Sequence, residues 1–566
     1  MYFKKLPSNY RDFYSYNLSI GKNNDRNIEG FDTETDSNGN ILVLASSRFH
    51  TSYRPSVLEC LSFLSKNDFN QGWFFNIGFD VDAIFKPIAD KIDFEKKGFW
   101  NVKIGKYQVK YLKGKMLYIK TKKGSKYFFD VNNFYEGSLS KVSRDILGME
   151  KTGENFNKNF MENENFDEVV KYCMNDAYLT KELAKILFTG IENISKDLIG
   201  VRSSPRRLLS RASLAEFYLI KKIPFEVLRP MYDFEILNYG YKAYHGGMFD
   251  LYERGLLSVD TIDLKSAYPY EISNLIDLSR GEWKYVKNFD ENAYYGFYHV
   301  KIKYNGFIPL QLKNGNVIYP VTEKRYEYYA TQNELKNFKD WEVIDGYVFY
   351  PSKIIKPFKP LIDYLFDLKE RNKENKVKYL LIKKIINSMY GKFVQIAGDK
   401  TGKIFNSVYG AVITSNTRLK IYEGMKLFDK IYEIDTDSIS GKLKNGFISG
   451  KNLGEFELKE KNSEKIIIEN GISLTPDLKT FFNTRGFSKS QIQNFKIKND
   501  KIIINFRRPL HMREAKVQKK LYEINKFEDF TKEISLVSTK KLFPSEWNLV
   551  DVQEGVFFGD EIFNEV

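Results

Sequence analysis

Four acidic residues near the N-terminus could together hold divalent cations. FDTETD places Asp32 and Glu34 two residues apart at the end of an expected strand, so both side chains face the same way. FFNIGFD adds Asp80, and KYCMND adds Asp176 one helical turn after Tyr172. Such a set could bind two cations and activate a water molecule for attack on a phosphodiester, with Tyr172 beside that water. Each element taken singly is typical of surface acids and a core tyrosine; their combination favours a metal site.

A second acidic group lies in the middle of the chain, again beside expected strands. TIDLKSAYPYEI places Asp263 after an apolar strand, and IYEIDTDSISGKL places Asp435 and Asp437 at the tip of a strand–turn–strand. Like charges repel at such a tip, and a bound cation removes that penalty. The pattern therefore indicates a second metal site, distant in sequence from the first.

Between these two segments, KKIINSMYGKF gathers polar groups on one stripe of an expected helix. Lys383, Asn387 and Tyr390 fall at i, i+4 and i+7, and Gly391 lets the backbone approach closely. The stripe offers an ammonium to a triphosphate and an aromatic face to a base pair. From residue 365 to 400 there are nine Lys/Arg against four Asp/Glu. A charge run of this kind is usually a solvated face, but here it surrounds a stripe with its own reason to be basic.

Composition excludes several other kinds of protein. The 566 residues exceed a typical domain of roughly 100–200 residues, and 42% hydrophobic residues exclude a disordered chain. Two cysteines and four histidines make a disulfide framework or a zinc-hydrolase site a poor fit, so any metal should be a hard cation held by carboxylates. The net charge of +15 favours a polyanionic partner, with a solvated basic surface as the alternative. Neither a run of 18 apolar residues nor a signal-like start occurs, so we expect a soluble protein that works inside a cell.

The elements that must position the first acidic group follow from hydrophobic patterning. A strand–turn–strand is expected around Asn38-Gly39, and a second hairpin around Lys123-Gly124. Residues 166–187 show helical spacing. A mixed sheet followed by helices predicts an α/β domain over about 1–195.

The rest of the chain is expected to form a separate part. The basic, Ser-rich segment 202–213 marks the boundary. Beyond residue 250, strands dominate until two helices that flank the polar residues 372–375. Strands return around 428–445, and the last 120 residues are mixed.

Taken in order, these motifs resemble those of the family B DNA polymerases, specifically the protein-primed branch of bacteriophages and linear plasmids. DLKSAYP resembles the Dx2SLYP motif, KKIINSMYG resembles Kx3NSxYG, and DTDS resembles YxDTDS. The similarity covers about residues 28–470, with NSMYG and DTDS as its specific signals. The segments that resemble the weaker motifs are Asp32-Thr-Glu34, Asn76-x3-Asp80, Tyr172-x3-Asp176, Ser138-Leu139 as the (S/T)L element, YHGG from Tyr244 to Gly247 as YxGG, and Thr414 with Arg418 as Tx2(A/G)R.

The resemblance implies an α/β and α+β multidomain fold, in which an RNase-H-like 3′→5′ exonuclease domain precedes a right-hand polymerase domain. The exonuclease domain would span residues 1–200 and the polymerase domain residues 201–566. Within the polymerase domain the expected parts are palm at about 240–275 and 394–450, an insertion that docks a terminal protein at about 276–355, fingers at about 358–393, and thumb with C-terminal region at about 451–566.

The resemblance also assigns roles in the polymerase site. Two catalytic Mg²⁺ ions, with Mn²⁺ as an alternative, would be held by Asp263, Asp437 and the carbonyl of Leu264, with Asp435 nearby. A deoxynucleoside triphosphate would be bound by Tyr268 under the sugar, Lys383 and Arg371 at the triphosphate, Asn387, and Tyr390 against the nascent base pair. A 3′-hydroxyl would then attack the α-phosphorus in line, with catalysis mostly by positioning and charge neutralisation.

The implied exonuclease uses the other acidic group, and further residues would contact DNA. Asp32, Glu34, Asp80 and Asp176 would hold the metal ions, with Lys151 as a weaker candidate for a lysine near that site. The implied DNA contacts are Thr35, Asn76, Phe79, Ser138 and Leu139 at a frayed primer end, Tyr244, Gly246 and Gly247 between the two domains, Thr414 and Arg418 on the primer, and Lys465 in the thumb.

The sequence departs from the family pattern at three places. The tyrosine expected two residues before Asp435 is Glu433 here, and Tyr432 lies one residue early, so either the hairpin is bulged or this tyrosine is dispensable. The thumb's KxY element has no clear match, and Lys465 is the nearest candidate. Only 20 residues separate Phe393 from Thr414. The β-hairpin that closes the template channel there in strand-displacing phage members is therefore expected to be absent or vestigial.

The sequence leaves several functions to weigh. The first is a replicative, protein-primed DNA polymerase with proofreading, partnered by template and primer DNA, a terminal protein and a single-stranded-DNA-binding protein. It would be a monomer without membrane contact, in the host cytoplasm. A family B polymerase that extends ordinary primers is the alternative, and residues 276–355 discriminate, because without a priming protein they have no obvious purpose. DTDS after a proofreading domain disfavours a reverse transcriptase, and the retained carboxylates disfavour an inactive nucleic-acid-binding protein.

Overall fold

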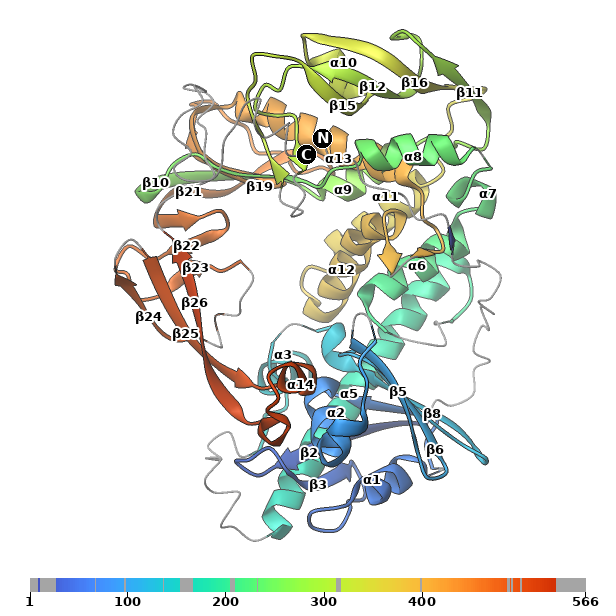
Figure 1. Cartoon of the computed structure of the whole chain (residues 1–566), viewed down its shortest axis with the longest axis vertical. Coiled ribbons are helices and arrows are strands. Elements are labelled where there is room, and N and C mark those ends of the chain that lie inside the picture. The colour runs from blue at the N-terminus through green and yellow to red at the C-terminus, as the bar shows by residue number, and fades with distance from the viewer. Residues whose placement is uncertain are drawn as a thin grey trace.

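The computed structural model describes most of the chain, and Figure 1 shows its course. The described residues are 9–10, 27–66, 68–95, 98–135, 137–152, 166–203, 209–231, 233–311, 317–397, 400–485, 489, 492–498 and 501–535. Among them, no helix combines the length and the apolar character needed to cross a bilayer.

The N-terminal part is built on a seven-stranded mixed sheet, in which β2, β3 and β4 are mostly buried on both faces. Its strand order is β3-β2-β4-β8-β7-β6-β5, in which β2, β4 and β8 run parallel and the other neighbours antiparallel. Successive side chains point to opposite faces, so Trp73 packs with α5 while Phe74 packs with α1 and α2. The elements are β2 (Ile28–Thr35), β3 (Ile41–Ser46), α1 (Val57–Leu64), β4 (Gln71–Phe74), α2 (Ile77–Phe85), β5 (Phe99–Ile104), β6 (Tyr107–Leu112), β7 (Met116–Thr121), β8 (Gly124–Asp130), α3 (Leu139–Leu147) and α5 (Phe166–Ile199).

The middle of the chain carries a second seven-stranded sheet, which is antiparallel throughout. Its order is β23-β22-β21-β10-β20-β19-β9, so the strand that ends beside Asp263 lies next to the β19–β20 hairpin. α9 (Ala267–Asn274) and α13 (Ser407–Met425) pack against it through a shared buried cluster. The strands are β9 (Met248–Leu251), β10 (Gly255–Leu264), β19 (Phe428–Thr436), β20 (Ser438–Leu443), β21 (Phe456–Glu469), β22 (Ile472–Leu474) and β23 (Phe481–Asn483).

Two helices stand beside this sheet and form the expected fingers. They are α11 (Lys359–Arg371) and α12 (Lys376–Phe393), which flank residues 372–375 as predicted. The side chain of Asn375 caps α12 by accepting the Lys378 N–H, which explains why the second helix begins there. α12 packs against α6 (Arg211–Lys222), which begins within the segment 202–213 predicted as a domain boundary.

Between α9 and α11 the chain forms a four-stranded antiparallel sheet that we call the insertion. Its order is β11-β16-β12-β15, and α8 (Phe234–Ala243) packs against β12 and β15. Figure 1 shows it at the opposite end of the molecule from the N-terminal sheet. Its elements are β11 (Gly281–Val286), β12 (Tyr295–Ile302), β15 (Tyr326–Thr331), α10 (Gln332–Asn337) and β16 (Trp341–Pro351).

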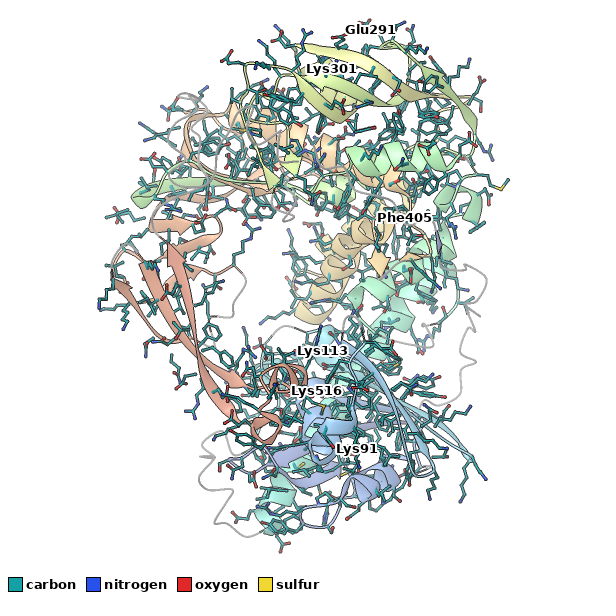
Figure 2. All side chains as sticks on the ribbon, in the orientation of Figure 1. Lys91, Lys113, Glu291, Lys301, Phe405 and Lys516 are labelled. Atoms are coloured by element: carbon teal, nitrogen blue, oxygen red, sulfur yellow. The ribbon has the colours of Figure 1, made fainter. Side chains whose placement is uncertain are left out.

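The C-terminal part returns to the N-terminal sheet and joins its core. After β24 (Ile492–Lys498) and β25 (Lys501–Pro509), the apolar side chains of residues 510–524 around α14 (Met512–Val517) enter the same buried cluster as α1 and α2. His511 Nδ1 lies 3.0 Å from Asp82 Oδ2, and Lys516 donates to the Ile92 carbonyl at the junction seen in Figure 2. The chain then leaves through β26 (Phe527–Ser535). The contact of residues 510–524 with the N-terminal core closes the path of the ribbon into a ring (Figure 1).

The segment between α12 and α13 is as short as the sequence predicts. Its described residues form only the two-residue strands β17 (Ile396–Ala397) and β18 (Lys400–Thr401), and β18 pairs in parallel with β1 (Asn9–Tyr10). No long β-hairpin is present among the described residues at this position. The ring is therefore closed elsewhere, by the C-terminal contact.

Candidate active sites

Three carboxylates meet where β2 lies against α5. Asp32 and Glu34, two residues apart, lie on the same face of β2, and Asp176 comes from α5. Each of the three offers one carboxylate oxygen within 4.8 Å of the others. Gly30 permits this approach, since a Cβ there would lie 1.9 Å from the Ala177 carbonyl oxygen. The sequence-predicted trio is therefore assembled in space.

The electrostatics of this trio suit a bound cation. Burial, together with the charge of Asp176, raises the pKa of Asp32 to about 8, and burial raises the pKa of Asp176 to about 6. Asp32 Oδ2 and Asp176 Oδ1 are buried without a hydrogen-bond partner among the described residues. Buried carboxylate oxygens without donors are costly, and a hard cation satisfies both at once. The residues present therefore fit a metal ion.

Lys151 and Tyr172 border the trio. Lys151 Nζ lies 2.6 Å from Asp176 Oδ2 and 4.6 Å from the centroid of the Tyr172 ring. Tyr172 is half-buried one turn before Asp176 on α5, and burial raises the pKa of its hydroxyl to about 12. The structure thus brings the weaker candidate Lys151 beside the trio.

Asp80 lies next to the trio but is held differently. It is buried in α2, and its Oδ1 accepts the hydroxyl hydrogen of Thr33 at 2.8 Å. Burial raises its pKa well above the usual value, and the charge of Asp32 adds to the shift. Its position supports a fourth carboxylate at the site, although it is not one of the three whose oxygens cluster.

The predicted contacts to a frayed primer end differ in exposure. Asn76 and Ser138 are exposed, at the N-caps of α2 and α3, and Phe79 is half-buried. Thr35 and Leu139 are buried, with Leu139 inside the core under α3. The Leu139 side chain packs against protein, and its contact with DNA stays a prediction.

The second site lies at the ends of β10 and β19. Asp263 pairs across from Ser438, and the Leu264 N–H donates to the Asp437 carbonyl at 2.6 Å. Thr436, between the two hairpin aspartates, has a φ of 55°, which is rare for a β-branched residue. This tight turn brings the Asp437 segment beside Asp263, and the Leu264 carbonyl belongs to the same strand end.

Burial and mutual repulsion raise the pKa values of these aspartates as well. Burial, with the charges of Asp263 and Asp435, raises the pKa of Asp437 to about 7. Burial also raises the pKa of Asp263 to about 6, partly offset by Lys459, whose Nζ lies 4.0 Å away. The pKa of Asp435 is raised by burial and opposed by Arg485. A cation held between Asp263 and Asp437 would relieve this penalty, so the donor set fits a hard metal.

A cavity of about 610 Å³ opens beside the two aspartates. Its walls come from the second sheet and from both finger helices, and they are rich in lysine. The lining residues are Asp263, Lys265, Ser266, Ala267, Tyr268, Pro269, Lys369, Glu370, Lys373, Tyr379, Lys383, Asn387, Asp437, Glu457 and Lys459. Carboxylates at one end and ammonium groups around them suit a metal-bound polyphosphate.

Behind Tyr268, which lines this cavity, lie two further tyrosines. Tyr390 stacks on Tyr268 with a centroid distance of 4.3 Å and an angle of 26°. The hydroxyl of Tyr390 is hydrogen-bonded to that of Tyr244, from the YHGG segment. The structure therefore joins three predicted tyrosines from separate motifs into one layer.

Arg371, predicted as a triphosphate ligand, and its neighbour Lys369 lie differently with respect to this cavity. Arg371 is 78% exposed, lies 3.9 Å from Asp367, and does not line the cavity. Lys369 does line it, is only 6% exposed, and places Nζ 3.3 Å from Ser266 Oγ. Lys369 follows the buried Leu365 by one helical turn, whereas Arg371 lies on another face of α11. That i, i+4 relation was the signal available in the sequence; Lys265, Lys373 and Lys459 were missed with no comparable signal.

The residues predicted to contact the primer, Thr414 and Arg418, are both buried. Thr414 is fully buried and donates to the Gly410 carbonyl at 3.1 Å. Arg418 is 5% exposed and donates to the carbonyls of His245 and Gly246 at 3.0 and 2.8 Å. Both side chains hydrogen-bond to protein segments, and their contact with a primer stays a prediction.

Lys465 likewise points inward. It is 2% exposed, with Nζ 3.0 Å from Glu460 and 3.9 Å from Glu433. The predicted thumb contact to DNA stays a prediction. The pairing of β19 with β20 shifts register between Ile431 and Glu433. The structure therefore has the first of the two alternatives weighed for this departure, a bulged hairpin, and Glu433 at the bulge is one of the partners of Lys465.

A mixed sheet with a carboxylate trio, followed by an antiparallel sheet with two aspartates, finger helices and a closing C-terminal part, defines the architecture of a right-hand polymerase with an attached exonuclease fold. The chain belongs to the family described as DNA polymerase type B, organellar and viral, whose model matches residues 97–411. The predicted family B membership and multidomain fold are confirmed.

Individual relatives agree with this assignment. A protein described as a probable DNA polymerase from Neurospora intermedia is 27% identical over 259 residues, covering 42% of this chain and 26% of that protein. The chain thus spans about a quarter of that relative's length. Phi29 DNA polymerase with primer–template DNA and incoming nucleotide superposes with a TM-score of 0.63 at 15% identity, over 91% of this chain and 100% of that one. Phi29 DNA polymerase with single-stranded DNA gives 0.58 at 17% identity, over 82% and 93%. These structures share the fold.

Proposed function

We propose that this chain is a DNA-directed DNA polymerase with a 3′→5′ proofreading exonuclease, which replicates a viral or linear-plasmid genome. The observation that carries the proposal is the pair of separate carboxylate sites on different sheets. One is a compact trio with buried, unpartnered oxygens, and the other borders a lysine-lined cavity. Family membership supports the polymerase, and the phi29-like fold supports the addition of an exonuclease.

Mg²⁺ is the proposed metal at both sites. Asp32, Glu34 and Asp176 would hold it in the exonuclease, with Asp80 beside them, and Asp263 with Asp437 in the polymerase. When bound, such ions polarise phosphoryl oxygens and stabilise the leaving oxygen of a phosphodiester. Oxygen ligands alone, with neither thiolate nor imidazole in the trio, suit this hard cation.

The residues around the cavity would bind and orient a deoxynucleoside triphosphate. Lys383 and Lys369, from opposite finger helices, would neutralise the triphosphate, with Asn387 one turn after Lys383. Tyr268 would pack under the sugar and exclude a 2′-hydroxyl, while Tyr390, stacked behind it, would support the nascent base pair. The primer 3′-hydroxyl is thereby positioned for in-line attack, so most of the rate comes from orientation and charge neutralisation.

The exonuclease residues would break a phosphodiester bond by hydrolysis, whereas the polymerase residues would form one. Tyr172 would hold the attacking water through its hydroxyl, and Lys151 would steady the carboxylate of Asp176 and the charge that develops on the phosphate. Asn76, Phe79 and Ser138, the accessible members of the predicted set, would guide a single-stranded 3′ end.

Initiation on a protein hydroxyl is part of the proposal, with extension of an ordinary primer as the alternative. The insertion supports protein priming because it adds a whole four-stranded sheet between the two segments that carry Asp263 and Lys383. We further propose a terminal protein and a single-stranded-DNA-binding protein as partners, and the cytoplasm of the host cell as the place of action.

Two assays test the proposed function. Purified chain with Mg²⁺ should extend a primed template with deoxynucleotides and degrade single-stranded DNA from its 3′ end. With a cognate terminal protein and a labelled deoxynucleotide, it should label that protein. Absence of primer extension would contradict the polymerase, and normal extension without protein labelling would favour the ordinary-primer alternative.

A further inference from the structure

A buried arginine joins three parts of the polymerase domain. Arg418, on α13, directs Nη1 at the carbonyls of His245 and Gly246 and Nη2 at Glu334 Oε1, 2.7 Å away. The two charged side chains are only 5% and 4% exposed. A buried ion pair persists only with good geometry and further hydrogen bonds, and breaking it leaves an uncompensated charge inside the protein.

The segment held by Arg418 borders the proposed nucleotide site. A Cβ on Gly247 would lie 2.6 Å from Thr436 Cγ2 and 2.9 Å from the Tyr268 hydroxyl. Thr436 is the left-handed residue between the hairpin aspartates, so Gly247 packs directly on the strained metal-site turn. At the other end of the segment, the Tyr244 hydroxyl bonds to Tyr390. A shift of this backbone would move the sugar contact and the aspartate turn together.

The partner of Arg418 belongs to the insertion. Glu334 is in the first turn of α10, where its Oε2 accepts the Thr331 N–H at 3.0 Å. Tyr328, on β15, donates its hydroxyl to Glu334 Oε1 at 3.4 Å and packs its ring parallel to His245. Tyr319 donates to the Gly247 carbonyl at 3.4 Å. The insertion therefore contacts the YHGG segment directly through a ring and a hydroxyl, and indirectly through the Glu334 carboxylate, which binds Arg418.

We propose that Arg418 and Glu334 are positioning residues, which seat residues 245–247 against the nucleotide site and make its geometry depend on how the insertion is docked on α13. This inference rests on the proposed polymerase function. It replaces a direct primer contact by Arg418 with an indirect role: the pair acts on turnover and sugar selection, and leaves the affinity for DNA unchanged. A protein bound to the insertion would act on the nucleotide site through the same contacts.

The test compares Glu334→Gln and Arg418→Lys with a matched surface control. Glu342→Gln removes the carboxylate of an exposed pair in the same insertion, 3.7 Å from Arg325. Each protein is assayed for kcat and KM of nucleotide incorporation, for ribonucleotide discrimination, and for primer–template affinity over a salt series. Degradation of single-stranded DNA, which uses the other sheet, reports whether each variant is folded.

We expect Glu334→Gln and Arg418→Lys to lower kcat at least tenfold and to reduce sugar discrimination, with exonuclease activity, DNA affinity and its salt slope as in the wild type and in Glu342→Gln. The double variant should lose little more than either single one, because the two side chains act as a unit. A phosphate contact would instead show as weaker DNA binding with a salt slope reduced by about one in Arg418→Lys, and that result would overturn the proposal.

The activity of the wild-type chain distinguishes a failure of the proposed polymerase function from a failure of the positioning role. If the wild-type chain incorporates no nucleotide, the proposed function fails and this inference with it. If the wild type polymerises and Glu334→Gln equals Glu342→Gln in kcat and discrimination, only the positioning role is wrong. If a variant also loses exonuclease activity, Glu334→Asp decides: recovery of folding without recovery of kcat supports the role, and full recovery of kcat with a shortened side chain contradicts it.

Discussion

The two carboxylate sites of this molecule are built to different plans. The exonuclease trio is assembled within one domain, from one strand and the helix packed on it, and its compensating cation Lys151 is 2.6 Å away. The polymerase aspartates come from two strands of the second sheet, and the lysines that face them stand on separate finger helices.

The difference reflects what each site must accept. A site that only cuts the end of a strand can be compact and preformed around its metal. A site that joins a nucleotide to a primer needs room for both, and the charge of the triphosphate must be met by groups from a second element. Cations therefore surround an open cavity of about 610 Å³ in one case and close a carboxylate trio in the other.

The largest expected effect distinguishes two cationic residues of α11, Lys369 and Arg371. Lys369→Met should lower kcat/KM for nucleotide incorporation by about 100-fold, because a fixed cation facing the triphosphate is lost. Arg371→Met, two residues later and exposed, should change it by less than about threefold. Steady-state incorporation on a primed template measures both. The reverse order would restore Arg371 as the ligand.

A smaller loss is expected in the compact site. Lys151→Met should slow degradation of single-stranded DNA by about 30-fold while nucleotide incorporation stays unchanged, since its ammonium contacts Asp176 and the Tyr172 ring at the trio. Lys185→Met, which removes an exposed lysine from the same helix α5, is the control. Equal exonuclease rates for the two variants would show that Lys151 merely balances charge in the absence of metal.

The smallest effect concerns the sugar. Tyr268→Val should raise ribonucleotide incorporation relative to deoxyribonucleotide by about tenfold, because the ring that meets a 2′-hydroxyl is gone. Tyr268→Phe keeps the ring and should retain discrimination. Competition between labelled ATP and dATP on a defined template gives the ratio. An unchanged ratio in the valine variant would remove Tyr268 from the sugar gate.

Local features were predictable from the sequence, because they depend on neighbours along the chain. The strand ends that carry Asp32 and Asp263, the break between the finger helices and the bulge beside Glu433 all follow from patterning, turn residues or motif spacing. The short segment after α12 follows from chain length alone.

Contacts made across the fold were not predictable in the same way. Arg418 and Glu334 are 84 residues apart, and their burial depends on how the insertion packs on α13. Motif spacing assigned Arg371 to the triphosphate, but the rotation of α11 in the structure presents Lys369. The C-terminal ring closure depends on apolar residues near 510–524 that carry no motif.

The two carboxylate sites are proposed to perform separate reactions. Primer extension and single-strand degradation, measured in parallel with Mg²⁺ for Asp437→Ala and Asp32→Ala, test it most directly. We expect Asp437→Ala to lose nucleotide incorporation and to keep degradation of single-stranded DNA. We expect Asp32→Ala to lose degradation and to keep incorporation. Loss of both activities to the same extent in either folded variant would show one shared site and contradict the account.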